Sequence, residues 1–150
     1  MRALIQRVSS ASVEIKMKQA AAINHGLLVL IGIETLDTDE DVKWLSQKLS
    51  GLRVFSDEDQ NMNLNIKDVD GEVLLVSQFT LHAKTKKGNR PSFIKAARPE
   101  QAIPLYNLFI EQLDSLINKK TKTGLFGAMM NVSLVNDGPV TIMIDSKNRE

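Results

Sequence analysis

Cysteine is absent from the chain, and histidine occurs only twice, as His25 and His82. Without thiols the protein can form no disulfide, no zinc–thiolate site and no cysteine nucleophile. Two histidines are too few for a metal site built from several imidazoles, and a Ser-His-Asp triad would have to use one of them. We therefore expect no metal site, and no motif in the sequence requires a cofactor.

Long hydrophobic runs and an excess of one charge are also missing. No apolar segment approaches the length that spans a membrane. Arg7, the second arginine of the N-terminus, lies where a signal peptide would continue its apolar stretch. We expect a cytoplasmic protein with no membrane partner. The net charge is only +1, so overall electrostatics predict no strong affinity for nucleic acid, although local patches can supply it.

What is present is a globular composition, with 43% hydrophobic and 25% charged residues, which argues against disorder of the whole chain. The length suits one domain over residues 1–150. Strands are predicted over residues 4–8, 12–15, 26–33, 53–56, 73–81, 130–135 and 140–144. One helix is expected between the caps at residues 37–39 and Gly51, and another begins at Pro99 or Pro104. This pattern predicts an α+β fold: a compact, largely antiparallel, barrel-like sheet with two main helices packed against it.

Two basic stretches are candidates for contact with RNA phosphates. The first, within residues 84–98, contains Lys84, Lys86, Lys87, Arg90, Lys95 and Arg98, and the second contains Lys119, Lys120 and Lys122. Such runs also occur as ordinary solvated loops, and the sequence leaves both interpretations open. The Arg-Pro-Ser-Phe run at residues 90–93 is rigid and partly apolar, which indicates a shaped loop.

Four further segments have ordinary structural interpretations. Residues 57–61 alternate acids and amides as a calcium loop does, but Met62 stands where that loop needs glycine, so a polar loop is favoured. No motif of a hydrolase triad accompanies His82, which is expected to be an ordinary surface or structural histidine. Residues 77–80 either line a cleft at the end of a buried strand or simply alternate between its faces. Residues 136–139 are predicted to form a hairpin turn between the last two strands.

Several motifs, which occur in a fixed order along the chain, indicate a protein family, which the patterns above do not. They are residues 5–8 (IQRV), 11–13 (ASV), 26–30 (GLLVL), 62–65 (MNLN), 76–81 (VSQFTL), 90–93 (RPSF) and 132–141 (VSLVNDGPVT). At this spacing the sequence resembles the D-aminoacyl-tRNA deacylases (the D-tyrosyl-tRNA deacylase family) along nearly its whole length. The resemblance implies a proofreading hydrolase that cuts the ester at the 3′ end of D-aminoacyl-tRNA.

The resemblance also implies a two-fold homodimer with its active sites at the interface. The catalytic residues would be Ser77, Gln78, Phe79 and Thr80, here called the SQFT motif. Gly138 and Pro139, here called the Gly-Pro motif and joined by a cis bond in this family, would cross from the partner subunit and bind substrate. Arg7 matches an arginine that steadies this motif, and Met130 matches a methionine of the pocket wall. Met129 departs from the acid found there in many bacterial relatives.

An aminoacyl ester is already activated, so its hydrolysis requires mainly a placed water and a stabilised oxyanion. We expect backbone N–H groups near Phe79 and Thr80 to form the oxyanion hole and the 2′-OH of the terminal adenosine to assist proton transfer. Selection against L-amino acids by steric exclusion would leave glycyl-tRNA as a substrate.

Three competing hypotheses remain open at the level of sequence. Thr80 could act as a covalent nucleophile, which needs an activating base, and His82 is expected on the same face of the strand. The chain could instead be a non-catalytic RNA-binding module, for which the basic stretches are the only support. It could also be a general peptidase or esterase, which the lack of a triad disfavours.

Overall fold

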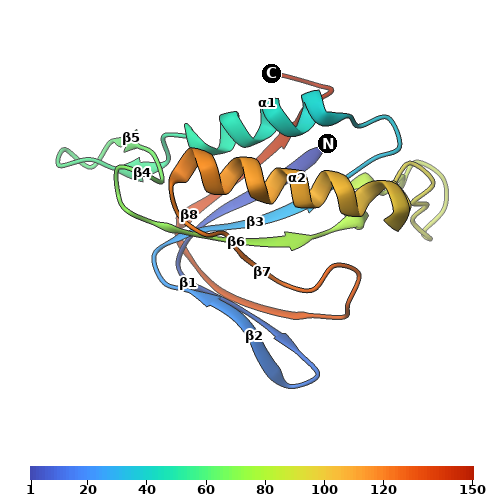
Figure 1. Ribbon diagram of the computed structural model, residues 1–150, viewed down its shortest axis with the longest axis horizontal. Coiled ribbons are helices and arrows are strands. Elements are labelled where there is room, and N and C mark those ends of the chain that lie inside the picture. The colour runs from blue at the N-terminus through green and yellow to red at the C-terminus, as the bar shows by residue number, and fades with distance from the viewer.

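A mixed β-sheet and two helices that cover one of its faces make up the molecule (Figure 1). The computed structural model describes residues 1–150. The strands are β1 (Arg2–Ile15), β2 (Lys18–Ile23), β3 (Gly26–Gly32), β4 (Phe55–Ser56), β5 (Met62–Leu64), β6 (Glu72–Ser77), β7 (Lys122–Thr123) and β8 (Asn131–Asp145). The helices are α1 (Asp39–Ser50), α2 (Pro99–Ile117) and the short 3₁₀ helix η1 (Phe79–His82). The predicted α+β fold is confirmed.

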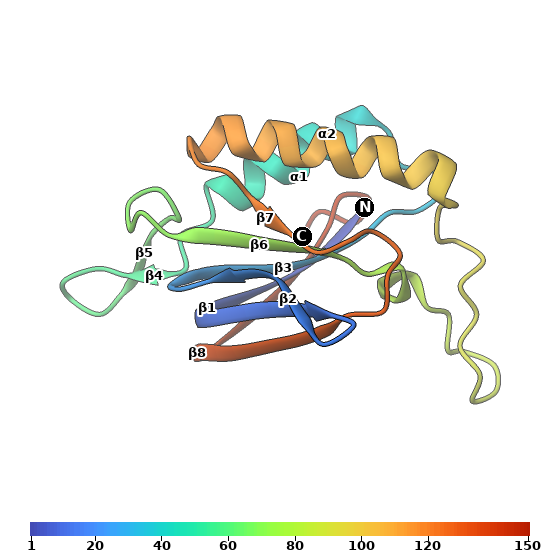
Figure 2. The ribbon, with the colours of Figure 1, turned by 60° about the horizontal axis from the view of Figure 1, so that its bottom comes forward.

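Strand β1 organises the sheet because it is long enough to pair with three other strands. Its first half pairs antiparallel with β3, and its second half pairs antiparallel with β2. Strand β8 runs antiparallel along the other side of β1 for nearly its whole length. The sheet continues from β3 through parallel pairs to β6 and β7. It curls so that β1, β2 and β8 lie beneath β3 and β6, on the side away from the helices (Figure 2).

Apolar side chains pack on both faces of the central strands. A core of 22 buried residues lies between the sheet and the helices, and a second core of 7 buried residues lies on the opposite face. In β6, Val73 and Leu75 belong to the first core, whereas Leu74 and Val76 belong to the second. A strand buried on both faces is apolar at every position, which explains the continuous apolar runs in β3 and β6.

Both helices begin close to residues predicted from the sequence, and α1 also ends where it was predicted to end. Thr38 is the N-cap of α1, its backbone N–H donates to the Asp41 carboxylate at 2.9 Å, and Gly51 is the C-cap. Helix α2 begins at Pro99, a position that needs no N–H donor. Pro104 lies inside α2, so the alternative start at that residue is wrong. No helix has the length and apolar character needed to cross a membrane.

Two strand predictions are wrong where the candidate site lies. The strand predicted over residues 73–81 ends at Ser77, after which the chain turns into η1. The two strands predicted at the end of the chain are one strand, β8, because both halves pair with β1. Residues 136–139 are therefore not a hairpin turn. They form an irregularity inside β8, where its register against β1 shifts between Gln6 and Val8, as at a β-bulge.

Candidate active site

The SQFT motif lies at the carboxyl end of β6, where the sheet stops. Ser77 still pairs with Ile31 of β3, and the Gln78 backbone N–H donates to the Ile31 carbonyl at 2.7 Å. Phe79 and Thr80 begin η1, and the leading N–H groups of a helix have no partner within it. Both of these side chains are exposed. The motif thus presents backbone donors at the rim of a rigid sheet.

Thr80 and His82 do not form a pair of nucleophile and base. The Thr80 hydroxyl is exposed and accepts a hydrogen bond from the Gln78 side-chain amide. His82 is only 2% exposed, and its Nε2 has no hydrogen-bond partner. The expectation that both residues share a face assumed a strand. It is wrong, because three residues complete a turn of a 3₁₀ helix and residues two apart point in different directions.

The Gly-Pro motif occupies the irregular centre of β8. Gly138 has a φ of +149°, which residues with side chains rarely adopt, and a β-carbon there would lie 2.8 Å from the Val140 nitrogen. The Gly138-Pro139 peptide bond is cis. Asn136 braces the segment, because its side-chain oxygen accepts the Val140 N–H at 2.8 Å and its side-chain nitrogen donates to the Val140 carbonyl at 3.1 Å. Sequence reasoning missed this role. The signal was an asparagine able to hydrogen-bond the nearby backbone.

Arg7 lies directly behind the Gly-Pro motif, and its side chain is only 11% exposed. Its Nε donates to the Asp137 carbonyl at 2.8 Å, and its Nη1 donates to the Val54 carbonyl at 2.6 Å. The Asp137 carboxylate lies 3.4 Å from Nε as an ion pair. Arg7 therefore ties the irregular segment of β8 to the chain just before β4.

Within one chain the two motifs lie at opposite ends of the sheet. Ser77 pairs with Ile31, which in turn pairs with Ala3 of β1. The Gly-Pro motif lies opposite the other end of the β1–β3 pair, beside Arg7. At about 3.3 Å per residue, the step from Ala3 to Arg7 spans roughly 13 Å along the strands, and three strand spacings of about 4.8 Å separate β6 from β8. One chain therefore does not bring the motifs together.

Met130 lies away from the Gly-Pro motif and on the side of β6, because its sulfur packs against Gly124, whose backbone N–H donates to the Leu75 carbonyl at 3.3 Å. It precedes β8, whose first residue, Asn131, pairs with Glu14 near the far end of β1. Met130 is half-buried against the second core, whereas the neighbouring Met129 is 92% exposed. Of the predicted site residues, the structure thus places Arg7 beside the Gly-Pro motif and leaves the SQFT motif and Met130 apart from them.

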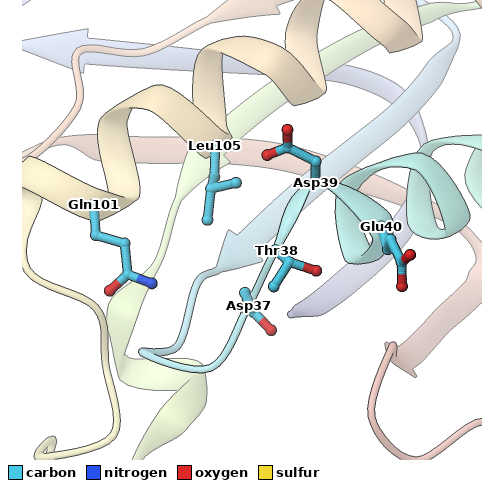
Figure 3. Close-up of a pocket in the computed structure, with 6 residues that line it drawn as sticks. All are labelled: Asp37, Thr38, Asp39, Glu40, Gln101 and Leu105. Carbon is cyan, nitrogen blue, oxygen red and sulfur yellow. The ribbon is translucent and has the colours of Figure 1, made fainter.

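A cavity of about 590 Å³ opens between the beginnings of α1 and α2 (Figure 3). It is lined by Asp37, Thr38, Asp39, Glu40, Gln101 and Leu105. Gln101 and Leu105 project from α2 toward the loop that leads into α1. None of the predicted site residues lines this cavity, and its acidic side chains repel a phosphate-rich substrate. The end of β6 is therefore the better candidate for an RNA-linked ester.

Comparison with known proteins identifies the family. A model of the D-Tyr-tRNA(Tyr) deacylase family matches residues 4–145. The chain belongs to this family. Proteins named D-aminoacyl-tRNA deacylase from Flavobacterium psychrophilum and Cytophaga hutchinsonii are 60% and 61% identical to it over 150 residues, with 100% of both chains covered in each case.

Solved structures share the fold of this member of the deacylase family. One, described as c-Myc DNA Unwinding Element Binding Protein, has a TM-score of 0.91 and 42% identity, covering 97% of this chain and 98% of its own. Another, described as a probable eukaryotic D-amino acid tRNA deacylase, has a TM-score of 0.82 and covers 95% of this chain and 97% of its own. At 16% identity, the second structure supports the fold alone.

Proposed function

We propose that the chain hydrolyses the ester bond of D-aminoacyl-tRNA and releases free tRNA and the amino acid. The match to the deacylase family over residues 4–145 is the observation that carries this function. Relatives that are 60% identical over their whole length are named for the same activity. The enzyme is thus a hydrolase of carboxylic ester bonds that proofreads chirality in translation. We further propose that it acts in the cytoplasm as one domain over residues 1–150.

The direct test compares D- and L-alanyl-tRNA built on the same tRNA body. We expect the purified protein to release alanine from the D-ester and to leave the L-ester intact over the same period. Equal release from both esters would indicate an unselective esterase. No release from either would contradict the proposed activity.

The SQFT motif is the proposed catalytic segment. The backbone N–H groups of Phe79 and Thr80 face no partner within η1, so they are suited to bind the oxyanion that forms when water attacks the ester carbonyl. One such donor contributes about 10²–10³ to the rate in other hydrolases. The buried His82 is not available as a base for Thr80, which favours proton transfer through the substrate's own 2′-OH.

A second copy of the chain is proposed to complete each site. Because the two motifs lie apart within one chain, one site can contain both only if the SQFT motif of one subunit meets the Gly-Pro motif of another, and this supports the proposed dimer. Strand β8 pairs only with β1 and exposes Leu134, Val135 and Met143, and an apolar edge strand is suited to association. In a two-fold dimer both sites are equivalent. The Gly-Pro motif, supported by Arg7, and Met130 would then form the substrate-binding side of each pocket.

Selection of D-amino acids is proposed to work by exclusion. A rigid backbone at the Gly-Pro motif would occupy the space that an L-side chain needs, while a D-side chain points away. Rejection by clash cannot act on glycine, which has no side chain. We therefore expect glycyl-tRNA to be hydrolysed under conditions in which L-alanyl-tRNA survives. If glycyl-tRNA survives as well as L-alanyl-tRNA does, the pocket recognises the D-side chain directly.

A nucleic-acid-binding module without catalysis is the second candidate. It is favoured by the 42% identical structure described as a DNA Unwinding Element Binding Protein and by the exposed cations of residues 84–98. The two functions differ in one observable, which is the release of amino acid from charged tRNA. Tight binding of nucleic acid without that release would favour the binding module.

A further inference from the structure

We propose that the loop of residues 84–98, here called the basic loop, binds the phosphates of the tRNA acceptor stem. This inference rests on the proposed function and adds the surface that recognises the body of the RNA. The sequence contains two basic stretches and offers no way to choose between them. In the structure they differ in ion pairing, in anchoring and in position.

Ion pairing neutralises the second basic stretch. Lys119, Lys120 and Lys122 pair with Asp70, Asp114 and Glu72 at 2.6, 3.1 and 2.7 Å. No cation of the basic loop takes part in an ion pair, and the chain has no carboxylate between Glu72 and Glu100. Unpaired positive charge that is exposed to solvent attracts polyanions and releases their counterions.

The basic loop is held at its base and free at its tip. Lys84 and Ser92 exchange backbone hydrogen bonds of 2.8 and 3.0 Å, which close the loop. Phe93 packs edge to face on Phe79 of the SQFT motif, with ring centroids 5.1 Å apart. Gly88, near the tip, has a φ of +68° and open space around it. The loop is therefore anchored on the candidate site and presents its cations to solvent.

Position also favours the basic loop. It leads into the first turn of α2, whereas the second stretch follows the last turn. A helix of 19 residues is about 28 Å long at 1.5 Å per residue, so the two stretches lie far apart. Figure 2 shows the basic loop, in yellow, projecting beyond the body of the molecule on the side where η1 lies.

The partner that fits this arrangement is RNA whose reactive end lies in the pocket. The ester ends a single strand that leads into a duplex, so the phosphates behind that end must pass close to whatever flanks the SQFT motif. The basic loop flanks it directly through the contact between Phe79 and Phe93. Lysine and arginine side chains at this place would hold the RNA backbone without reading its sequence.

The test uses two variants that each remove three charges. The loop variant carries Lys86→Ala, Lys87→Ala and Arg90→Ala, and the control variant carries Lys119→Ala, Lys120→Ala and Lys122→Ala. The probe is an RNA hairpin that carries no amino acid and copies an acceptor stem with its single-stranded 3′ end. Its binding is measured by fluorescence anisotropy at several salt concentrations. We expect the slope of log affinity against log salt to fall by about 0.9 for each lost phosphate contact in the loop variant. The control variant should keep the wild-type slope.

Kinetics separates RNA binding from chemistry. In the loop variant, kcat/KM for D-alanyl-tRNA should fall roughly 3- to 100-fold, as the loss of three exposed ion pairs predicts. Hydrolysis of D-alanyl-adenosine, which has the same ester and no stem, should fall far less. Wild-type affinity and slope in the loop variant, equal losses in both variants, or a preference for a DNA duplex would overturn the proposal. If the proposed function is wrong, the wild-type protein will hydrolyse neither D-alanyl-tRNA nor D-alanyl-adenosine. In that case the RNA-binding comparison of the two variants still tests the role of the basic loop.

Discussion

Thr80 is exposed at the proposed site and has no base beside it, so its hydroxyl is suited to orient substrate rather than to attack it. We expect Thr80→Ala to slow deacylation by raising its activation free energy by about 1–3 kcal/mol, the usual penalty for one lost hydrogen-bond partner. Removal of a true nucleophile would leave only a small residual rate. Single-turnover rates of Thr80→Ala and of the control Thr80→Ser measure the difference. An amino acid trapped covalently on Thr80, detected by mass spectrometry, would contradict this role.

Arg7 acts on the Gly-Pro motif without being exposed at the surface of the site. Arg7→Ala leaves the carbonyls of Asp137 and Val54 without their donor, which we expect to lower stability by about 1–3 kcal/mol. Because small misplacements at a site are costly, we also expect kcat to fall more than KM rises.

Arg7→Lys is the control for this positioning role, because lysine keeps the charge but cannot donate along two fixed directions. Compared with Arg7→Ala, Arg7→Lys should recover part of the lost stability but little of the lost kcat. Unfolding midpoints and steady-state kinetics measure both effects. Wild-type kcat with an unchanged preference for D- over L-esters in Arg7→Ala would separate Arg7 from the site.

The beginning of α1 is tied to the end of the chain through one carboxylate. Asp41, at 3% exposure, accepts hydrogen bonds of 2.7 Å from both the Ser146 hydroxyl and the Lys147 ammonium group. Burial alone would raise the pKa of Asp41, but the hydrogen bonds from Lys147, Ser146 and Thr38 hold it well below its ordinary value. This lowered pKa makes the folded state sensitive to acid.

The sign of that sensitivity follows from linkage. A carboxyl whose pKa is lower in the folded state stabilises the fold fully above its unfolded pKa of about 3.9, and the effect is lost as the pH falls toward the folded pKa. We expect Asp41→Asn to lower the unfolding midpoint at neutral pH and to lose less further stability below about pH 4 than wild type does. Glu40→Gln, in the same turn but exposed, is the control. Parallel pH profiles for wild type and Asp41→Asn would contradict the assignment.

The sequence predicts the bounds of some helices and strands better than those of others. The ends of α1 were predictable because Thr38 and Gly51 act on neighbouring backbone. The course of β8 was not, because the same Asn-Asp-Gly-Pro residues suit a hairpin turn and a bulge. Only pairing with β1, which brings Arg7 to Asp137 across 130 residues of sequence, decides between them. Strand β2 was missed because its Lys-Gln-Ala-Ala-Ala-Ile sequence has low strand propensity, and pairing with β1 supplies what propensity lacks.

The prediction of the candidate site depended on family motifs more than on the local pattern of polar and apolar residues. The spacing of residues 77–80 is that of simple alternation in a strand, and only their resemblance to a family marked them. Their 3₁₀ geometry, which turns His82 inward, arises where β6 leaves the sheet. The position of Arg7 under the Gly-Pro motif is likewise a product of tertiary packing, because nothing near Arg7 in the sequence indicates its acceptors.

At the scale of the whole molecule, subunit mixing tests whether the site is shared. Gly138→Ala should inactivate the Gly-Pro side, because a β-carbon clashes with Val140, and Phe79→Gly should impair the SQFT side. In a mixed dimer of these variants, one site contains both changes and the other contains neither. With random exchange half of the dimers are mixed and one of their two sites is intact, so about a quarter of wild-type activity should return. No recovery after verified exchange would show that each chain holds a whole site.

A site divided between two chains makes the rate law depend on assembly. Ser77 and Gly138 of one chain lie at opposite ends of the sheet, and with the proposed shared site a lone chain would contribute no turnover. Well below the dissociation constant of the dimer, the population of complete sites rises with the square of protein concentration. Dilution would then remove activity faster than it removes protein. In a cell holding few copies, a modest fall in expression would weaken the removal of D-amino acids disproportionately, and abundance itself would set the stringency of proofreading.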